Sequence, residues 1–317
     1  MLEKGKITAF QMGVIMYPTI LATAVLIVPA ISAKFARNDL WLSPLLASLS
    51  GFLTMALAYQ LHRRFPKQSV IQYGEKIAGR AAGKAIGLLF LLFYLHTNGL
   101  IVRQYADFVS SAFMPNTPMI VISASLVAVV SLSVRSGIEG VARSSFFCSL
   151  LFAGAAVILL PLIPDLDAKN ILPIMEHGIL PAIRGMIVPQ SWFCEFFLIS
   201  FLLPYVSNAK DGLKWGTWSV IAVTMALVYT NLFILFLYGE RVQDLIYPML
   251  TATRYIRIGG FIENFESIVM MIWVLGNFVK ISVFHYAVSI GFAQWLRLTD
   301  FKALVFPIGV LVVLSSI

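Results

Sequence analysis

Three ionisable side chains interrupt segments that are otherwise apolar: Arg103, Glu195 and Lys280. A charge inside a membrane segment is expensive, so each is a candidate functional residue. Glu195 could bind a ligand ammonium group or a cation, or exchange a proton. Alternatively, it could accept hydrogen bonds from backbone groups that are freed by a helix break at Pro189.

Lys280 and Arg103 also allow two interpretations each. Lys280 could act as a fixed internal cation, or its apolar stem could carry the ammonium to the membrane surface. Arg103 and Asp107 are four residues apart, so on a helix they share a face and can pair. Such a pair either fixes its helix near the outer surface or takes part in an outer gate.

The other residues that could carry chemistry do not converge. His96, His177 and His285 are scattered, without the spacing of a metal site. No nucleophile has a base at a suitable spacing, and no Walker-type phosphate loop is present. The sequence therefore predicts no catalytic residue, no metal ligand and no cofactor.

The composition is that of a polytopic membrane protein. Of 317 residues, 59% are hydrophobic and 12% are charged, and the mean hydropathy is +0.88. We expect one integral membrane domain over residues 1–317, with Cys148 and Cys194 reduced and buried in apolar spans. Stretches of about 20 apolar residues predict spans near 9–34, 41–62, 84–112, 118–134, 144–163, 182–205, 214–239, 263–291 and 301–317.

The distribution of basic residues predicts the orientation. With the N-terminus inside, the inner connections carry about twice as many Lys and Arg residues as the outer ones, which favours a cytoplasmic N-terminus. The inner connection 63–83 mixes apolar residues with charges and predicts a short interfacial helix. The outer connection 240–262 predicts a short amphipathic lid ahead of the eighth span.

Two of the predicted spans carry signs of interruption. The first contains Pro18 and Pro29 around the tract Ala22-Thr23-Ala24, and the sixth contains Pro189 and Pro204. Broken helices in matching positions of two halves indicate an inverted-repeat transporter with a ligand site near the midplane.

At this level of detail the chain resembles the spore germination permease family, the B subunits of endospore germinant receptors within the amino acid/polyamine/organocation transporter superfamily. No single residue identifies the family, but the order and spacing of the matching residues together do. The matching residues are Ile27-Val28-Pro29, Arg64-Phe65-Pro66, Gln72-Tyr73, Arg103, Pro115-Asn116-Thr117-Pro118, Gly137-Ile138-Glu139, Ala142-Arg143, Pro164-Asp165-Leu166, Leu172-Pro173-Ile174, Glu195, Gly260-Phe261-Ile262-Glu263, Glu266 and Phe278-Val279-Lys280.

The resemblance implies an all-α, five-plus-five inverted repeat with helices one and six broken. It also implies a small nutrient, an amino acid by family resemblance, bound between spans one and six. In related sodium-coupled transporters a cation lies between spans one and eight, where Lys280 could replace it. The predicted ligand-binding residues are Thr19, Ala22, Thr23, Ala24, Asn98, Ser191, Phe193, Cys194, Glu195, Trp273 and Asn277, and the predicted coupling or gating residues are Arg103, Asp107 and Lys280.

The chain departs from the family pattern in three places. The break in span one usually holds glycines and here is Ala22-Thr23-Ala24, and the glycine usually before the span-six glutamate is Cys194. Both replacements make the breaks stiffer. Family members have ten spans, so we expect the sequence to stop in or after helix nine.

Three functions compete. The first is the membrane subunit of a nutrient germinant receptor in the spore inner membrane, which signals to A-type and C-type partner subunits. The second is a secondary amino acid permease. The third is a subunit of a ligand-gated ion pathway, in which Arg103, Glu195 and Lys280 would line a pore or gate. No nucleic-acid partner is predicted.

Overall fold

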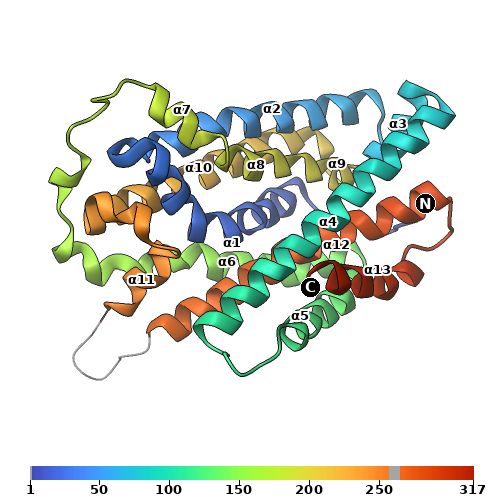
Figure 1. The fold of residues 1–317 in the computed structure, drawn as a ribbon. Coiled ribbons are helices and arrows are strands. Elements are labelled where there is room, and N and C mark those ends of the chain that lie inside the picture. The colour runs from blue at the N-terminus through green and yellow to red at the C-terminus, as the bar shows by residue number, and fades with distance from the viewer. Residues whose placement is uncertain (1, 257–264) are drawn as a thin grey trace.

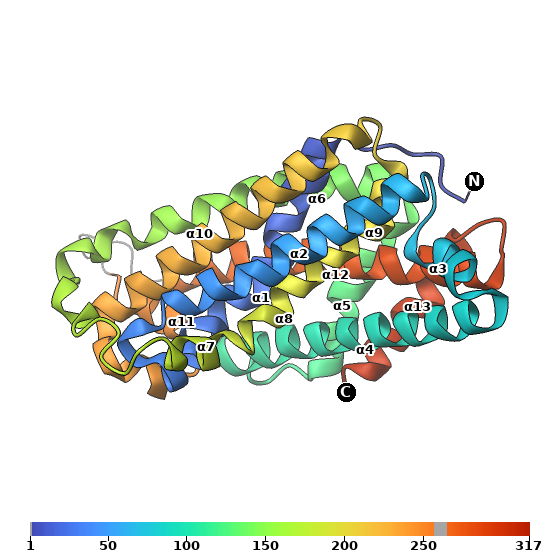
Figure 2. The ribbon, with the colours of Figure 1, turned by 90° about the horizontal axis from the view of Figure 1, so that it is seen from above.

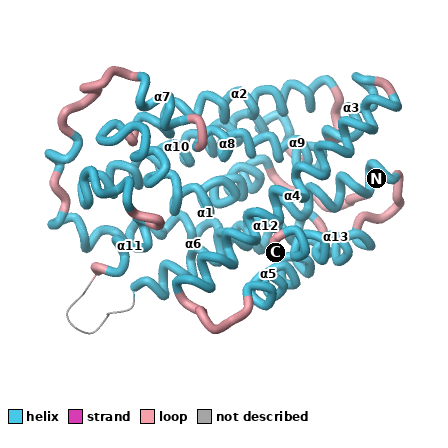
Figure 3. Tube along the Cα trace, in the orientation of Figure 1, coloured by secondary structure: helices cyan, strands magenta, loops and turns pink. Residues whose placement is uncertain are grey.

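The computed structural model describes residues 2–256 and 265–317, and it is almost entirely helical (Figure 3). The predicted lid at 240–262 and the start of the eighth predicted span fall partly on residues 257–264, which lie outside this range. The α-helices are α1 (Ala9–Ala36), α2 (Leu42–Arg64), α3 (Val70–Ala78), α4 (Arg80–Ala112), α5 (Met119–Arg135), α6 (Ile138–Ala153), α7 (Leu180–Met186), α8 (Pro189–Cys194), α9 (Ile199–Leu202), α10 (Gly212–Tyr238), α11 (Pro248–Arg254), α12 (Phe265–Leu296) and α13 (Lys302–Ser315).

Short 3₁₀ segments complete several of these helices. The helix α6 continues as η2 (Gly154–Asp165), and the connection after α8 continues as η4 (Glu195–Leu198). The remaining segments are η1 (Arg37–Asp39), η3 (Ala168–Ile171), η5 (Leu203–Tyr205), η6 (Ala209–Asp211) and η7 (Gly239–Asp244).

Length and hydropathy identify the helices that can cross a bilayer. Within the described ranges, six helical segments qualify, and α7 together with 189–205 makes a seventh that is bent by 49°. The helices α5 and α13 are apolar but shorter, with 17 and 14 residues. The prediction of an all-α, transporter-like membrane fold is confirmed.

The helix α1 lies in the middle of the bundle. It packs against α10, α12, α6 and α7, and it runs through the centre of the molecule in two perpendicular views (Figures 1 and 2). In its most apolar stretch 72% of the residues are buried, against 22% for the segment formed by α6 and η2. The surroundings of α1 are therefore protein, whereas α6 and η2 form an outer wall.

The predicted break in span one does not occur as an interruption. The helix α1 is continuous over 28 residues, with Pro18 and Pro29 inside it. Alanine is the best helix former and threonine is tolerated, so the tract Ala22-Thr23-Ala24 keeps the helical conformation that glycines would weaken. The prediction of a broken helix one was wrong in this respect.

The predicted break in span six is present. The helix α7 ends at Met186 and α8 begins at Pro189, a first-turn position where the missing N–H of proline costs nothing. The chain changes again to 3₁₀ geometry at Glu195. The sixth span is therefore a series of short helical pieces.

Three contacts fix α1 and the residues ahead of it against the rest of the molecule. A Cβ atom on Gly13 would lie 2.7 Å from the carbonyl oxygen of Trp215, so α1 and α10 approach too closely for a side chain there. Before α1, the Ile7 amide donates to the Tyr205 carbonyl at 3.1 Å. The Glu3 carboxylate accepts a 2.9 Å hydrogen bond from the Ile138 amide, at the start of α6.

A helix is also found in the inner connection, where the sequence predicts one. The helix α3 is short and starts with a capping box between Ser69 and Gln72. Glu75 on α3 forms a 3.1 Å ion pair with Arg297, just beyond α12. This pair and a hydrogen bond from Ser69 to Gln294 hold α3 against the end of α12.

Candidate functional site

A buried ion pair joins α12 to the broken sixth span. The Nζ atom of Lys280 lies 2.6 Å from Oε2 of Glu195, and the exposed fractions of the two side chains are 0% and 14%. A fully buried ammonium cannot reach the membrane surface, so the position of Lys280 favours the internal cation over the extended, surface-reaching side chain. The pair brings together two residues that are 85 positions apart.

The elements on either side position this pair. Glu195 stands where α8 ends and η4 begins, and its carboxylate meets Lys280 of α12 from there. The Lys280 ammonium lies 5.6 Å from the centre of the Phe284 ring, one turn further along α12. The Tyr94 ring of α4 packs edge-on against Phe284 and Phe201 at 5.8 Å. An aromatic wall therefore shields the pair.

Two indole groups contact the middle of α1. Trp192 of α8 donates from Nε1 to the Thr23 hydroxyl at 2.8 Å. Trp273 of α12 donates from Nε1 to the Ala22 carbonyl, an acceptor inside a continuous helix. Together these bonds, which we call the indole clamp, tie α8 and α12 to the tract that the sequence marks as the break.

Aromatic rings cover the clamp on one side. The Trp273 ring stacks on Tyr105 at 5.7 Å with an interplanar angle of 17°. It also lies 4.1 Å from the Phe108 ring, tilted by 51°. The space beside the middle of α1 is therefore filled by side chains of α4 and α12.

Two of the predicted ligand residues are buried amides with polar atoms that have no hydrogen-bond partner among the described residues. Asn98 is fully buried in α4, and neither its Nδ2 nor its Oδ1 atom is bonded. Asn277 donates to the Trp273 carbonyl at 3.0 Å, but its Oδ1 atom is unpartnered. Such atoms are costly, and a water molecule or a polar ligand group would satisfy them.

The other predicted ligand residues are distributed unevenly. Thr19 is buried and donates to its own helix, at the Ile15 carbonyl. Ala22, Ala24 and Phe193 are fully buried, whereas Ser191 is exposed and bonds to the Val188 carbonyl.

The prediction that both cysteines are buried was wrong. Both are free, but Cys194 is exposed and Cys148 is intermediate. Cys194 is the last residue of α8, where the sixth span changes to 3₁₀ geometry, and Cys148 lies on α6, in the outer wall that is only 22% buried.

The predicted coupling residues Arg103 and Asp107 do pair, at 3.7 Å, with side chains that are 44% and 47% exposed. Arg103 also donates to the backbone carbonyls of Ser316 and Ile317, at the end of α13. The pair lies apart from the buried Lys280–Glu195 pair and holds α4 to α13. Its role in gating stays a prediction.

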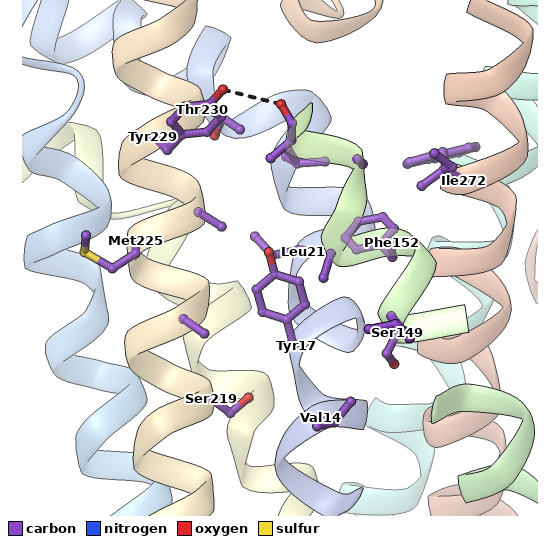
Figure 4. Close-up of a pocket in the computed structure, with 18 of the residues that line it drawn as sticks. Val14, Tyr17, Leu21, Ser149, Phe152, Ser219, Met225, Tyr229, Thr230 and Ile272 are labelled. Atoms are coloured by element: carbon purple, nitrogen blue, oxygen red, sulfur yellow. Dashed lines mark hydrogen bonds between the residues drawn. The ribbon is translucent and has the colours of Figure 1, made fainter. Parts of the chain in front are cut away.

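Sequence reasoning missed a cavity of about 670 Å³ on another side of α1 (Figure 4). It lies between α1, the segment of α6 and η2, α10, α11 and α12, and Trp273 is the single predicted ligand residue among those that line it. Its lining is almost wholly apolar. The only sequence signal is a set of aromatic and small residues that membrane spans commonly carry.

The fold is that of known transporters. One match is a Na⁺-coupled sialic acid symporter in a substrate-bound outward-open state, with a TM-score of 0.72, 15% identity, and coverage of 98% of this chain and 74% of that chain. Another is Mhp1, a nucleobase-cation-symport-1 family transporter in a closed conformation, with a TM-score of 0.65, 12% identity, and coverage of 98% and 72%. At such identities the likeness concerns the fold alone.

The sequence comparisons identify the family. Spore germination protein KB of Bacillus subtilis (strain 168) is 23% identical over 327 residues, covering 100% of this chain and 86% of that protein. Spore germination protein YndE of the same organism is 24% identical, covering 98% and 87%, and spore germination protein GerQB of Bacillus cereus is 23% identical, covering 84% and 74%. The family model for spore germination proteins matches residues 6–317, and the chain therefore belongs to this family of multi-pass integral membrane proteins.

Proposed function

We propose that the chain is the membrane subunit of a spore nutrient receptor that binds a free amino acid beside the middle of α1. The observation that carries the proposal is the buried pair of Lys280 and Glu195, next to the indole clamp. An amino acid carries an ammonium and a carboxylate, which are the two charges that this pair complements. The fold and the family support a ligand site of the transporter type.

The ligand would replace the bond between Lys280 and Glu195 by one bond to each of them. Its ammonium would bind Glu195 and its carboxylate would bind Lys280, so both buried charges remain paired. Room for it requires Trp192 and Trp273 to release α1. The amide of Asn98 and the Oδ1 atom of Asn277, which have no partners, would then bind its polar groups. Each contact made only in the liganded state moves the equilibrium towards that state.

The signal would leave the subunit through α1 and the broken sixth span. Complete switching from 1:99 to 99:1 requires about 5.5 kcal/mol of differential affinity. We place the N-terminus in the cytoplasm because of the distribution of basic residues. The family resemblance supports the spore inner membrane as the location, and A-type and C-type receptor subunits as the partners that receive the signal.

The test is equilibrium binding beside uptake, with purified protein in liposomes. The twenty proteinogenic L-amino acids are first screened by thermal shift, and those that raise the melting temperature are used as radiolabelled probes. We expect saturable binding without accumulation, and at least tenfold weaker binding by Glu195→Gln. Glu176→Gln is the control, since Glu176 is 62% exposed in a loop. No thermal shift by any amino acid, or equal binding by Glu195→Gln, would contradict the proposal.

The same experiment separates the alternative functions. Accumulation inside the liposomes that Glu195→Gln stops would make the chain an amino acid permease. An ion current on addition of the amino acid, lost in Lys280→Met, would make it part of an ion pathway.

A further inference from the structure

The cavity beside α1 is a groove between two walls. The helix α10 forms one wall, the segment of α6 and η2 forms the other, and α1 is the floor (Figure 4). The Tyr17 ring projects from the floor into the space, near Leu21 and opposite Met225. At one end the Tyr229 hydroxyl donates to the Ala156 carbonyl at 3.5 Å, which joins the two walls.

The rims of the groove face outwards and are apolar. The exposed side chains that flank it are aliphatic or aromatic, and exposure of this kind on a membrane helix means contact with lipid. They are Phe147 (69% exposed), Leu150 (66%), Val157 (62%), Trp218 (56%) and Met225 (63%). The groove therefore opens sideways to the hydrocarbon region.

The end of the groove opposite Tyr229 is aromatic and basic. The Phe10 and Trp215 rings meet there at 4.7 Å, and the Lys214 ammonium lies 5.7 Å from the centre of the Trp215 ring. Tryptophan and lysine occur together where a membrane helix meets the headgroups. This end therefore lies at the level of the headgroups.

Three of the elements that form the groove each bring a cation to this end. The cations are Lys6 ahead of α1, Arg143 on α6 and Lys214 on α10, and each precedes the innermost groove residue of its element by one to four positions. Glu139 lies between two of them, because it accepts from the Lys6 amide at 3.0 Å and pairs with Arg143 at 3.5 Å. The group keeps a net positive charge.

The volume of the groove is that of a site for a small molecule. The groove offers about 670 Å³, which lies within the range of about 300–1,000 Å³ that small-molecule sites have. This volume and the apolar lining suit an acyl chain.

We propose that this groove binds an anionic phospholipid, with an acyl chain between α10 and the segment of α6 and η2, and the headgroup phosphate at Lys6, Arg143 and Lys214. The apolar lining, the lateral opening and the basic end belong to one continuous feature. The bound lipid packs against α1, the helix whose middle the indole clamp contacts. The site does not include the Lys280–Glu195 pair and shares only Trp273 with the indole clamp, and it does not depend on the nutrient proposal.

The test is native mass spectrometry of the purified full chain. The protein is delipidated and then incubated with equal amounts of dioleoyl-phosphatidylglycerol and dioleoyl-phosphatidylcholine. We expect one retained phosphatidylglycerol. In the double variant Ala222→Phe with Ala226→Phe, which fills the groove, retention falls at least tenfold. The control is Ala128→Phe, at an exposed alanine of α5 outside the groove, which retains the lipid.

A second variant keeps the proposal testable if the filled groove prevents folding. Lys214 is exposed, so Lys214→Gln folds normally, and it reduces the preference for phosphatidylglycerol about fivefold. The control Lys76→Gln, on α3, leaves the preference unchanged. Equal retention of both lipids by the wild type, or unchanged retention in the filled groove, would overturn the proposal. A change of oligomeric mass in the groove variants, without loss of lipid, would instead assign the groove to a protein partner.

Discussion

Lys280 and Glu195 carry opposite charges at a buried place where either charge would be strongly unfavourable without the other. The removal of a charge from water costs several kcal/mol, and the attraction at 2.6 Å offsets this cost only while both partners are present. The pair therefore adds little net stability, but the loss of either partner alone destabilises the folded protein. Any ligand that enters must supply a charge to each partner.

We expect the single variants Glu195→Gln and Lys280→Met each to destabilise the protein by about 3–5 kcal/mol, because each leaves one buried charge unpaired. The double variant should recover at least half of this loss. The measurement is a double-mutant cycle of unfolding in detergent. Additive losses would mean that the two side chains are independent and that the pair does not form.

A second prediction concerns the indole clamp. Thr23→Val removes the acceptor of Trp192 while keeping the shape of the side chain, and the lost bond costs about 1 kcal/mol. The ligand-free state loses this bond, so sensitivity to the nutrient should rise. The measurement is the dose response for germination, at equal protein level by immunoblot.

The matched control for this prediction is Thr19→Val. The Thr19 hydroxyl donates within its own helix, to the Ile15 carbonyl at 2.8 Å, and not to α8 or α12. An equal shift in both variants would show that the effect comes from α1 itself and not from the clamp.

At the scale of residues, the sequence indicated which side chains matter more clearly than how they meet. Glu195 and Lys280 are visible as charges in apolar spans, since the cost of such a charge is a local property. Their pairing across 85 positions depends on how α8 and α12 pack, and no local pattern encodes it.

The elements divide into rigid and segmented ones. The helix α1 is continuous despite two prolines, and the sixth span is divided at Pro189 and again at Glu195. Proline marks a candidate break in each of these two spans, but tertiary contacts decide whether the helix is interrupted there. The alanines of α1 favour a helix, but glycine is replaced in both spans, so helix propensity alone does not explain why only the sixth span is divided.

The rigid helix depends on close contact with α10. Gly13→Ala should lower the melting temperature and the yield of folded protein, because the new Cβ would lie 2.7 Å from the backbone carbonyl of Trp215, which cannot rotate away. The expected loss is about 1–3 kcal/mol, the usual cost of overpacking. Thermal unfolding of the purified protein measures it.

The control is Gly74→Ala on α3. No atom lies within 4 Å of its added Cβ, so this variant should gain up to about 1 kcal/mol from helix propensity. If Gly13→Ala behaves like Gly74→Ala, α1 and α10 have room for a Cβ atom at this position, and the close contact is not required.

At the scale of the whole molecule, the N-terminal residues connect parts that are distant in sequence. Ile7 bonds to Tyr205 at the end of the sixth span, and Glu3 bonds to Ile138 at the start of α6. The N-terminal segment thus ties the start of α6 to the end of the sixth span. The sequence indicated the membrane fold and the family-like order of spans, but this connection and the groove beside α1 arise only from assembly.

Removing the Glu3 carboxylate should loosen this side of the molecule. In Glu3→Ala the Ile138 amide loses its acceptor, at a cost of about 1.5–3 kcal/mol. Hydrogen exchange should become faster at residues 138–142 and 205–207 and should stay unchanged at the outer end of α10. Glu176→Ala, in an exposed loop, serves as control. Uniform acceleration would point to global destabilisation instead of a local tie.

The fully buried ammonium of Lys280 has one more consequence. This ammonium is covalently part of the chain, so it does not exchange with ions in the medium. Its presence at the site does not depend on their concentration. If the nutrient binds beside it, the binding isotherm should be the same in sodium chloride and in choline chloride. Recognition would then require no ion gradient, and it would work across a membrane that is not energised.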